Sequence, residues 1–401
     1  MLREWAERDT VFQYPVLSLL GQNTLNEFGR ALAKWKLRRP LIVTDPILIK
    51  TGVVAQVIQQ LNIHKIKFVI FEGVKPNPST TVVNSIVKMY RRGECDALIS
   101  IGGGSAHDAI KGASLVLSNA KPIREFQGLN VSKNAAIMPI IAVNTTAGTG
   151  SGATNVAVIT DELKHFKMTL TDKNIQPHIL VDDSDLMMGL PVLSSVWTGI
   201  DTLVHGIEAD LSIYTSYFTK TYARQCMRMV YRFLPTIYQN PNNQEAREKL
   251  AYAEFLGGIA FNNSSLGFIH SLSHAMSGVF NTPHGLANGV LLPYVLDYEL
   301  KYNKVVAKIA KLGDYLCMDL PSKDELGKAK DAIRSIVTFT KGLGIPTNLN
   351  EVQPKITKQQ IHQMAIKAMK DFCGISNPVQ FSKREVMHIY QNAIQGKFDN
   401  I

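Results

Sequence analysis

Residues 267–288 hold three of the chain's ten histidines in an otherwise apolar, small-residue setting. His270 and His274 are four residues apart, so on a helix their imidazoles share one face. His284 stands between a proline and a glycine, a setting typical of a turn or a helix start. Imidazole binds divalent transition metals, but a complete site needs further ligands. A helix with two buried, hydrogen-bonded histidines and an unrelated turn histidine gives the same pattern, so this stretch alone leaves both interpretations open.

A second polar pair at helical spacing supplies such ligands. Asp201 and His205 share one face of a predicted helix. With His270 and His284 they make one carboxylate and three imidazoles, a four-ligand set for Fe²⁺ or Zn²⁺. The alternative for Asp201 and His205 is a hydrogen-bonded pair on a helix surface, and the histidine-rich segment in the same half of the chain favours the metal. His274 is then better placed as a proton relay or as a partner of the ligands than as a fifth ligand.

A glycine run in the first half has the character of a phosphate-binding turn. Residues 101–108 read IGGGSAHD and stand where an apolar strand turns into a helix. Glycines let backbone amides approach a bound group, and the helix presents its positive end. Ser105 and Asp108 have the spacing of a capping box, which would fix the start of that helix. A pyrophosphate is the natural ligand, although a tight strand-to-helix turn gives the same pattern.

Two further features of the first half could contact a nucleotide. Residues 144–151, NTTAGTGS, form a second hydroxyl-rich turn after a second apolar strand, and two such turns in one domain are more informative than either alone. Asp45 ends another strand, where its carboxylate could accept a ribose hydroxyl and repel a 2′-phosphate, favouring NAD over NADP. The Asp45–Pro46 pair could equally cap the next helix.

The spacing of apolar residues divides the chain near residue 190. Before it, β-rich runs alternate with helical ones, which predicts an α/β domain with a parallel sheet over residues 1–189. The strands are expected over 40–45, 66–71, 96–101 and 136–143, and helices over 48–61 and 82–92. After it, helical periods dominate and predict an all-helical domain over 190–401. Its helices are expected over 214–234, 244–261, 304–316, 324–342 and 383–395.

Composition narrows the class of protein. The 401 residues are 45% hydrophobic and 19% charged, as in ordinary globular proteins. The net charge of +10 is scattered, without the aromatic-interleaved basic stripe of a nucleic-acid module, so we expect no nucleic-acid partner and read most of the charge as solvated helix faces. The four cysteines are far apart, which argues against a disulfide framework. No window reaches transmembrane length and the amino terminus has no apolar signal core, so a cytoplasmic protein without a membrane partner is expected.

Several motifs together resemble the iron-containing (group III) alcohol dehydrogenases from about Phe12 to about Pro378. The matching stretches are 43–45, 76–78, 102–108, 145–151, 159–161, 199–208 and 267–293, in this order. The GGGSAHD version of the glycine run and the sequence AVNTT at 142–146 are most similar to the branch with 1,3-propanediol and methanol dehydrogenases.

The resemblance implies a fold and a set of site residues. The fold is a Rossmann-like dinucleotide domain followed by a helical metal domain, as in dehydroquinate synthase, with the site in the cleft between them. By the family pattern Asp201, His205, His270 and His284 bind the metal, and His274 lies beside the reacting carbon. The residues that would line NAD are Asp45, Asn77, Gly103, Gly104, Ser105, Asp108, Thr145, Thr146, Thr149 and Lys167. The family forms dimers and larger assemblies, so a homo-oligomer is expected.

Four positions depart from the family pattern, and none is a metal ligand. Gly152 stands where glutamate is usual, which bears on the nicotinamide end of the site. Residues 182–185, DDSD, replace a usual Asp-Pro, Gly206 replaces a common alanine, and Ala275 replaces a common proline.

The predicted activity is interconversion of a short-chain primary alcohol or diol with its aldehyde, by hydride transfer to or from NAD with Fe²⁺, or Zn²⁺, as Lewis acid. One rival is a metal- and NAD-dependent cyclising lyase of the dehydroquinate synthase type. That reaction must hold a phosphorylated acid with several cations near the metal, and the segments around Asp201 and His270 have none. Another rival is a catalytically idle metal- or nucleotide-binding scaffold, against which the complete ligand set argues.

Overall fold

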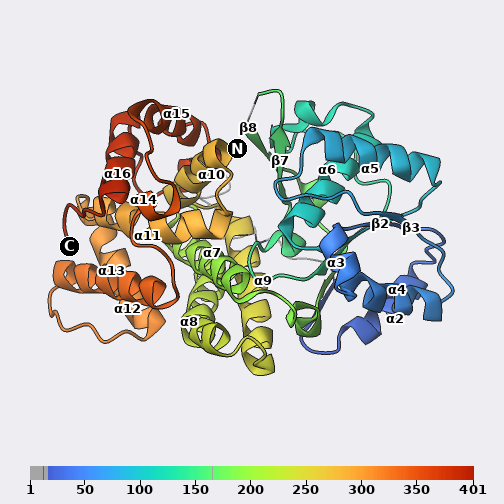
Figure 1. Cartoon of the computed structure of the whole chain (residues 1–401), viewed down its shortest axis with the longest axis horizontal. Helices are drawn as coiled ribbons and strands as arrows, with labels where there is room; N and C mark the ends of the chain where they lie inside the picture. Colours follow the sequence, from blue (N-terminus) through green and yellow to red (C-terminus); the bar gives the residue numbers. More distant parts are fainter. Residues whose placement is uncertain (1–11, 13–16, 165) are drawn as a thin grey trace. The chain divides into compact units, whose positions relative to one another are not determined.

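The computed structural model describes residues 12, 17–164 and 166–401, and these form two compact units. The α/β unit comprises residues 14–191 and 241–258, coloured blue to green in Figure 1 apart from the later segment. The helical unit comprises residues 192–240 and 259–401. Each unit is described by itself below.

The centre of the α/β unit is a parallel sheet in the order β1-β9-β6-β4-β2-β3. All six strands run in one direction, so their carboxyl ends meet at one edge, where ligands of such sheets bind. The four predicted strands are present as β2, β3, β4 and β6 and are shorter than predicted, whereas the edge strand β1 and its neighbour β9 were not predicted. The bounds are Leu17–Leu20 for β1, Leu41–Val43 for β2, Val69–Phe71 for β3, Leu98–Gly102 for β4, Ile140–Asn144 for β6 and Ile179–Asp182 for β9.

Helices cover both faces of this sheet. Helices α5 and α6 lie on one face and α2 and α4 on the other (Figure 1). Alternate strand residues serve the two faces: Leu41 and Val43 pack with α5 and α6, whereas Ile42 packs with α2 and α4. The strands are therefore apolar throughout. The helices are α2 Leu25–Lys34, α3 Pro46–Lys50, α4 Val53–Ile63, α5 Thr80–Arg92 and α6 Gly104–Asn119.

A small second sheet in the same unit was not predicted. Strands β7 and β8 pair antiparallel, and β8 pairs with β5 in parallel. Ala157, Ile159, Met168 and Leu170 point into the core beside α6. The elements are β5 Gly128–Leu129, β7 Val156–Asp161 and β8 Phe166–Thr171, with short 3₁₀ turns at Ile123–Phe126, Ser151–Ala153, Lys173–Ile175 and Ser184–Met187.

Helices make up the described part of the helical unit. The bounds are α7 Val192–Leu211, α8 Tyr217–Gln239, α9 Gln244–Ser264, α10 Phe268–Phe280, α11 His284–Glu299, α12 Asn303–Leu316, α13 Glu325–Gly342, α14 Leu349–Val352, α15 Lys358–Ala368 and α16 Lys383–Gln395. Residues 244–258 of α9 group with the α/β unit instead. Among the described helices, none combines the length and apolarity needed to cross a membrane.

Two glycines allow α7 to approach its neighbours closely. A Cβ on Gly206 would lie 2.6 Å from Met227 Cγ of α8. A Cβ on Gly285 would lie 1.9 Å from the Trp197 carbonyl oxygen of α7, so only glycine fits there. This second contact holds the first turn of α11 against α7 and so brings His284, its first residue, to the polar face of α7.

Candidate active site

Four polar side chains from three helices converge in the core of the helical unit. Asp201 and His205 lie on α7, His270 on α10 and His284 at the start of α11. The Asp201 Oδ1 atom lies 3.4 Å from His270 Nε2, 3.4 Å from His284 Nε2 and 3.7 Å from His205 Nε2. The side chains of the first three are at most 4% exposed, whereas that of His284 is 28% exposed, so the cluster opens to its surroundings at His284.

The spacing of these atoms fits a tetrahedral metal ion. Metal bonds to imidazole nitrogen and carboxylate oxygen are about 2.1 Å long, which places two ligand atoms of a tetrahedron about 3.4 Å apart. Two of the Asp201 distances equal this edge, and the third, to His205, is slightly longer. Asp201, His270 and His284 form the compact group, and the His205 ring stacks on that of His270 with centroids 4.8 Å apart.

Hydrogen bonds on the far side of two rings orient them toward the centre. His270 Nδ1 lies 2.5 Å from Glu208 Oε2, and His284 Nδ1 lies 3.0 Å from Ser273 Oγ. A ring that donates from Nδ1 keeps the lone pair of Nε2 for a cation. Glu208 is buried one turn beyond His205, and its Oε1 also accepts from Ile269 N at 2.7 Å. The sequence analysis did not assign Glu208, although its three-residue spacing from His205 on a helix places it near the same face.

The charges in the cluster favour an ionised carboxylate facing the imidazoles. Burial raises the pKa of Asp201, but His205, His284 and His270 outweigh it and hold the pKa well below the usual range. Burial lowers the pKa of His270, and Glu208 with Asp201 overcomes this and raises it to about 9. Asn288 Nδ2 donates to Asp201 Oδ1 at 2.6 Å and fixes the carboxylate. The donor set is therefore anionic and basic, as a divalent cation requires.

His274 is paired with a carboxylate that the sequence analysis missed. Its Nδ1 lies 2.8 Å from Asp371 Oδ2, and its ring stacks on His284 with centroids 4.9 Å apart. Asp371 is held by the Cys373 backbone N–H at 2.9 Å. Burial raises the pKa of Asp371, but His274 and the hydrogen bonds from Cys373 together outweigh burial and hold this pKa well below the usual range. The two residues are 97 positions apart, and nothing in the local pattern around Asp371 links it to His274.

The two predicted phosphate-binding turns lie side by side in the α/β unit. Strands β4 and β6 are neighbours, with Gly102 paired to Asn144, so both turns leave the carboxyl edge of the sheet together. A Cβ on Gly103 would lie 2.8 Å from Thr146 Oγ1, and one on Gly104 would lie 2.8 Å from Thr149 Cγ2. The glycines therefore let the turns pack together.

The predicted capping box at Ser105 and Asp108 is wrong. Helix α6 begins at Gly104 after Gly103, with no side-chain cap, so Ser105 already lies inside its first turn. Asp108 instead accepts from Ser151 Oγ at 2.7 Å and from Val158 N at 3.0 Å. Its carboxylate ties α6 to the second turn and to β7, a long-range partnership that local spacing could not indicate.

A buried lysine holds the end of the second turn, residues 144–151, in place. Lys111 Nζ donates to Ser151 O at 2.6 Å and Val156 O at 2.7 Å, with Ser151 Oγ and Thr154 Oγ1 at 3.1 and 3.3 Å. Burial lowers its pKa to about 8, partly opposed by Asp108. Lys167 lies near enough to Asp108 to help hold down the pKa of that carboxyl, which burial raises.

The structure places the remaining predicted nucleotide contacts on loops of the same unit. Asp45 caps α3: its Oδ1 accepts from Ile47 N at 2.8 Å and Leu48 N at 3.0 Å. The cap is therefore present, and the ribose contact stays a prediction. Asn77 adopts a left-handed conformation with φ of +56°, and Thr145, after β6, is buried and donates its N–H to Gly102 O.

Gly152 is explained by packing. A Cβ there would lie 2.6 Å from Leu180 Cδ1 of β9 and 3.8 Å from His107 Nε2. The usual glutamate would need Leu180 to move. Another carboxylate lies close to Gly152: Glu254 of α9 accepts a hydrogen bond from Gly150 N at 2.6 Å.

A buried polar network lies beneath the second turn. Asn144 Nδ2 lies 3.0 Å from Asp182 Oδ1 and 3.2 Å from Glu254 Oε2, and Asn144 Oδ1 lies 3.4 Å from His107 Nε2. Asp182 Oδ2 is buried and makes no hydrogen bond in the described structure. Burial, with the neighbouring Asp183, raises the pKa of Asp182 to about 7 although Asn144 opposes the shift.

Replacing Asp182 by asparagine should flatten the pH dependence of stability. A carboxyl with a pKa near 7 when folded and 3.8 when unfolded binds more protons in the folded state between these values, so its contribution to stability is lost as pH rises through this window. Relative to wild type, Asp182→Asn should gain on the order of a few kcal/mol as the pH rises from about 4 to about 7. Urea unfolding followed by Trp35 fluorescence measures this, with Glu72→Gln, an exposed site, as control. Parallel pH profiles for wild type and Asp182→Asn would contradict it.

Comparisons with known proteins cover both units. Residues 15–184 match the family "Iron-containing alcohol dehydrogenase", and residues 195–394 match "Fe-containing alcohol dehydrogenase family, C-terminal". The chain is 35% identical to alcohol dehydrogenase 4 of Schizosaccharomyces pombe over 96% of its length and 89% of that protein. It is 34% identical to the NAD-dependent methanol dehydrogenase of Bacillus methanolicus over 96% of its length and 100% of that protein.

Solved structures give the same result. A crystal structure of 1,3-propanediol oxidoreductase superposes with a TM-score of 0.92 at 32% identity, covering 96% of this chain and 99% of that one. The predicted combination of an α/β unit with a parallel sheet and an all-helical unit is confirmed. Because both halves match and the relatives extend over nearly the whole sequence, the chain belongs to the iron-containing alcohol dehydrogenase family.

Proposed function

We propose that the protein interconverts a short-chain primary alcohol or diol with its aldehyde, with Asp201, His205, His270 and His284 holding the metal. Family membership establishes the coarser part: an NAD-linked oxidoreductase that acts on alcohols, in a family named for iron. The single observation that carries the residue assignment is the spacing of 3.4 to 3.7 Å between Asp201 Oδ1 and three imidazole nitrogens. Fe²⁺ fits this oxygen and nitrogen donor set, and so does Zn²⁺.

The named relatives indicate the size of the substrate. One is a methanol dehydrogenase and one solved neighbour is a 1,3-propanediol oxidoreductase, and both act on small primary alcohols. The rival lyase reaction is not favoured, because the matched relatives are dehydrogenases of alcohols. An idle scaffold is not favoured either, because the ligand set is complete.

The residues of the helical unit divide the chemistry among them. When bound, the metal supplies Lewis-acid polarisation of the alcohol oxygen. Glu208 and Ser273 keep two ligand imidazoles turned toward the centre. His274, which stacks on the exposed ligand His284, takes up the alcohol proton at Nε2, because its Nδ1 is engaged by Asp371. The carbon that bears the hydroxyl group gives a hydride to the nicotinamide, so the two-electron oxidation of the alcohol balances the reduction of NAD.

The residues of the α/β unit hold the dinucleotide. We assign the pyrophosphate to Gly103, Gly104 and Ser105, at the amino end of α6, where backbone amides and the helix dipole favour an anion. Thr145, Thr146 and Thr149 present hydroxyls from the adjoining turn, with Asp108 and Lys167 beneath it. Asp45 and Asn77 complete the set on neighbouring loops, Asp45 toward the ribose.

An assay of the reconstituted protein tests this function. With Fe²⁺ present, NAD reduction at 340 nm should appear with methanol, 1-propanol or 1,3-propanediol and disappear with a chelator. NAD and NADP are compared in parallel. A clear preference for NADP would show that Asp45 caps α3 and does not select the cofactor. Absence of turnover with every alcohol and every aldehyde, in protein shown to contain iron, would overturn the proposal.

We also propose that the protein works in the cytoplasm as a homo-oligomer. The four scattered cysteines form no disulfide in the described part of the chain, which supports a reducing compartment. Light scattering of the purified protein measures the assembly, and a monomer at micromolar concentration would contradict it.

A further inference from the structure

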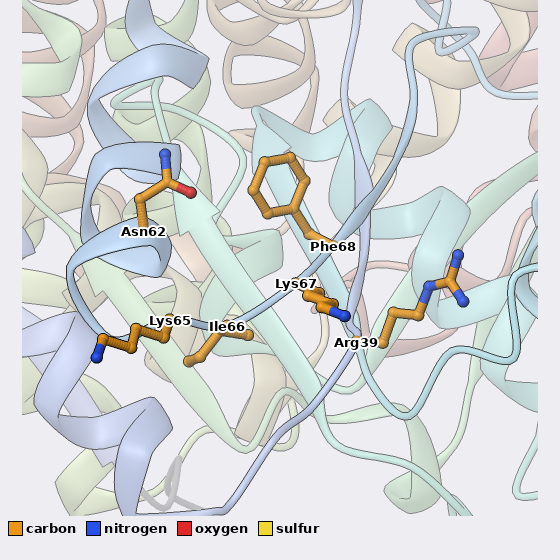
Figure 2. A pocket seen from close by; sticks show the side chains of 6 residues that line it. All are labelled: Arg39, Asn62, Lys65, Ile66, Lys67 and Phe68. Atoms are coloured by element: carbon orange, nitrogen blue, oxygen red, sulfur yellow. The ribbon is translucent and has the colours of Figure 1, made fainter.

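A basic pocket of about 550 Å³ lies in the α/β unit, and the proposed reaction does not use it. Figure 2 shows the side chains that line it, which include three cations, one amide and no acid. They are Arg39, Asn62, Lys65, Ile66, Lys67 and Phe68. The volume lies within the usual range for small-molecule sites, roughly 300 to 1,000 Å³.

The parallel sheet places two of the cations side by side. Leu41 of β2 pairs with Val69 of β3, and Val69 N donates to Pro40 O at 3.1 Å just before the strands. Arg39 and Lys67 each stand two residues before this pair and are therefore level with one another. They precede their strands, so the pocket lies at the amino edge of the sheet, whereas both dinucleotide turns leave its carboxyl edge. Asn62 and Lys65 come from the end of α4.

The charges of the pocket are not neutralised by salt bridges. Elsewhere in the described chain exposed cations pair with acids, for example Arg30 with Glu27 and Lys121 with Glu125. Within residues 17–164 and 166–401, no ion pair involves Arg39, Lys65 or Lys67. The adjacent acid is Asp96, whose carboxylate accepts the backbone N–H groups of Arg38 and Arg39 at 2.6 and 3.0 Å. Because these two bonds involve only backbone N–H groups, the guanidinium of Arg39 stays available to the pocket.

We propose that this pocket binds the polyphosphate group of a small molecule. A concave surface lined by one sign of charge concentrates field lines and attracts ligands of the opposite charge. Arginine can hold phosphate oxygens with two parallel bonds, and lysines add point charges. Three cations suit a chain of phosphates better than one carboxylate. Ile66 is buried and Phe68 half-buried, and both pack in the core with α2 and α4. The apolar wall that they offer to the organic part of the ligand is therefore chiefly the exposed part of Phe68.

Calorimetric titration of the full-length protein tests the site with two probes at constant ionic strength. Inorganic tripolyphosphate presents the phosphate chain alone, and ATP adds a sugar and a base. The protein is first saturated with NADH, so that the dinucleotide turns at the other edge are occupied, and both probes should still bind. Tighter binding of ATP would add a contribution from the apolar wall, and equal binding would assign the affinity to the phosphates.

A charge-matched pair of variants separates the pocket from general attraction. The triple variant Arg39→Gln, Lys65→Gln, Lys67→Gln should weaken tripolyphosphate binding at least about tenfold. The control Lys323→Gln, Lys328→Gln, Lys358→Gln removes the same charge at three exposed sites of the helical unit and should bind like wild type. Unchanged melting temperature and alcohol turnover show that both variants fold. Absence of binding to wild type that is saturated with NADH, or equal weakening in both variants, would each overturn the proposal.

Discussion

His270→Ala is expected to remove the metal from the purified protein and to abolish alcohol turnover. His270 is 1% exposed, and its Nε2 lies 3.4 Å from Asp201 Oδ1 while Glu208 holds its other nitrogen. Alanine removes one ligand and leaves the Glu208 carboxylate buried without its imidazole, so the centre loses both a bond and its charge balance. Lewis-acid polarisation supplies several kcal/mol, so turnover should fall by more than about a thousandfold.

Metal content by mass spectrometry and turnover of NAD are measured on the same preparation. His362→Ala is the matched control, because His362 is an exposed histidine on α15 of the same unit. NADH binding, followed by its fluorescence, should persist in His270→Ala, since the two turns assigned to the dinucleotide belong to the α/β unit. Full turnover by metal-free His270→Ala would sink the ligand assignment.

The sequence could indicate this centre because two of its four ligands form a local pair. Asp201 and His205 lie one helical turn apart, and helix spacing alone puts them on one face. The contact between α7 and α11 depends on Gly285, whose missing side chain leaves room for the Trp197 carbonyl. No periodicity shows that approach. His284 was predicted as a ligand from its place in the histidine-rich segment, and the family resemblance implies the same assignment.

Partners across long stretches of sequence were the ones missed. Asp371 and His274 meet because α10 packs beside the turn at Phe372–Ser376, and neither neighbourhood carries a sign of the other. Asp108 was read as a helix cap from its spacing, yet Ser151 and Val158 are stronger partners once the second turn folds over α6. The roles of all these residues in catalysis and cofactor binding remain predictions.

The main sheet and the helical unit were easier to predict than the second sheet and the boundary between the two units. Continuous apolar runs such as Leu98–Gly102 are typical of parallel strands buried on both faces, and the strand-helix alternation followed from them. The second sheet was missed although its strands Val156–Asp161 and Phe166–Thr171 have six residues each. They lie between β6 and β9, outside the strand-helix alternation from which the other strands were predicted. The family, the α/β plus helical fold and the oxidoreductase class are confirmed; the boundary at residue 190 stays a prediction.

Asp371→Asn should lower kcat by about a hundredfold while leaving metal content and the KM for NAD unchanged. Asp371 accepts from His274 Nδ1 at 2.8 Å and is itself held by the Cys373 N–H at 2.9 Å. An ionised carboxylate fixes the ring with its proton on Nδ1 and stabilises the imidazolium that forms when Nε2 takes a proton. Asparagine keeps the shape and the bond from Cys373 but lacks the charge, so proton transfer suffers and binding does not. The loss lies at the lower end of general acid–base effects, about 10²-fold.

Three measurements distinguish this positioning role from a structural one. If proton transfer becomes limiting, the solvent deuterium isotope effect on kcat should increase in Asp371→Asn, whereas a merely less stable protein would lower the active fraction without changing it. Lys370→Gln is the matched control, since it alters the exposed residue directly before Asp371 and leaves the carboxylate and its hydrogen bonds in place. His274→Ala should lose activity to a similar extent, and adding Asp371→Asn to it should cost little more, because the carboxylate acts through that ring. Additive losses in the double variant would show that Asp371 works independently of His274.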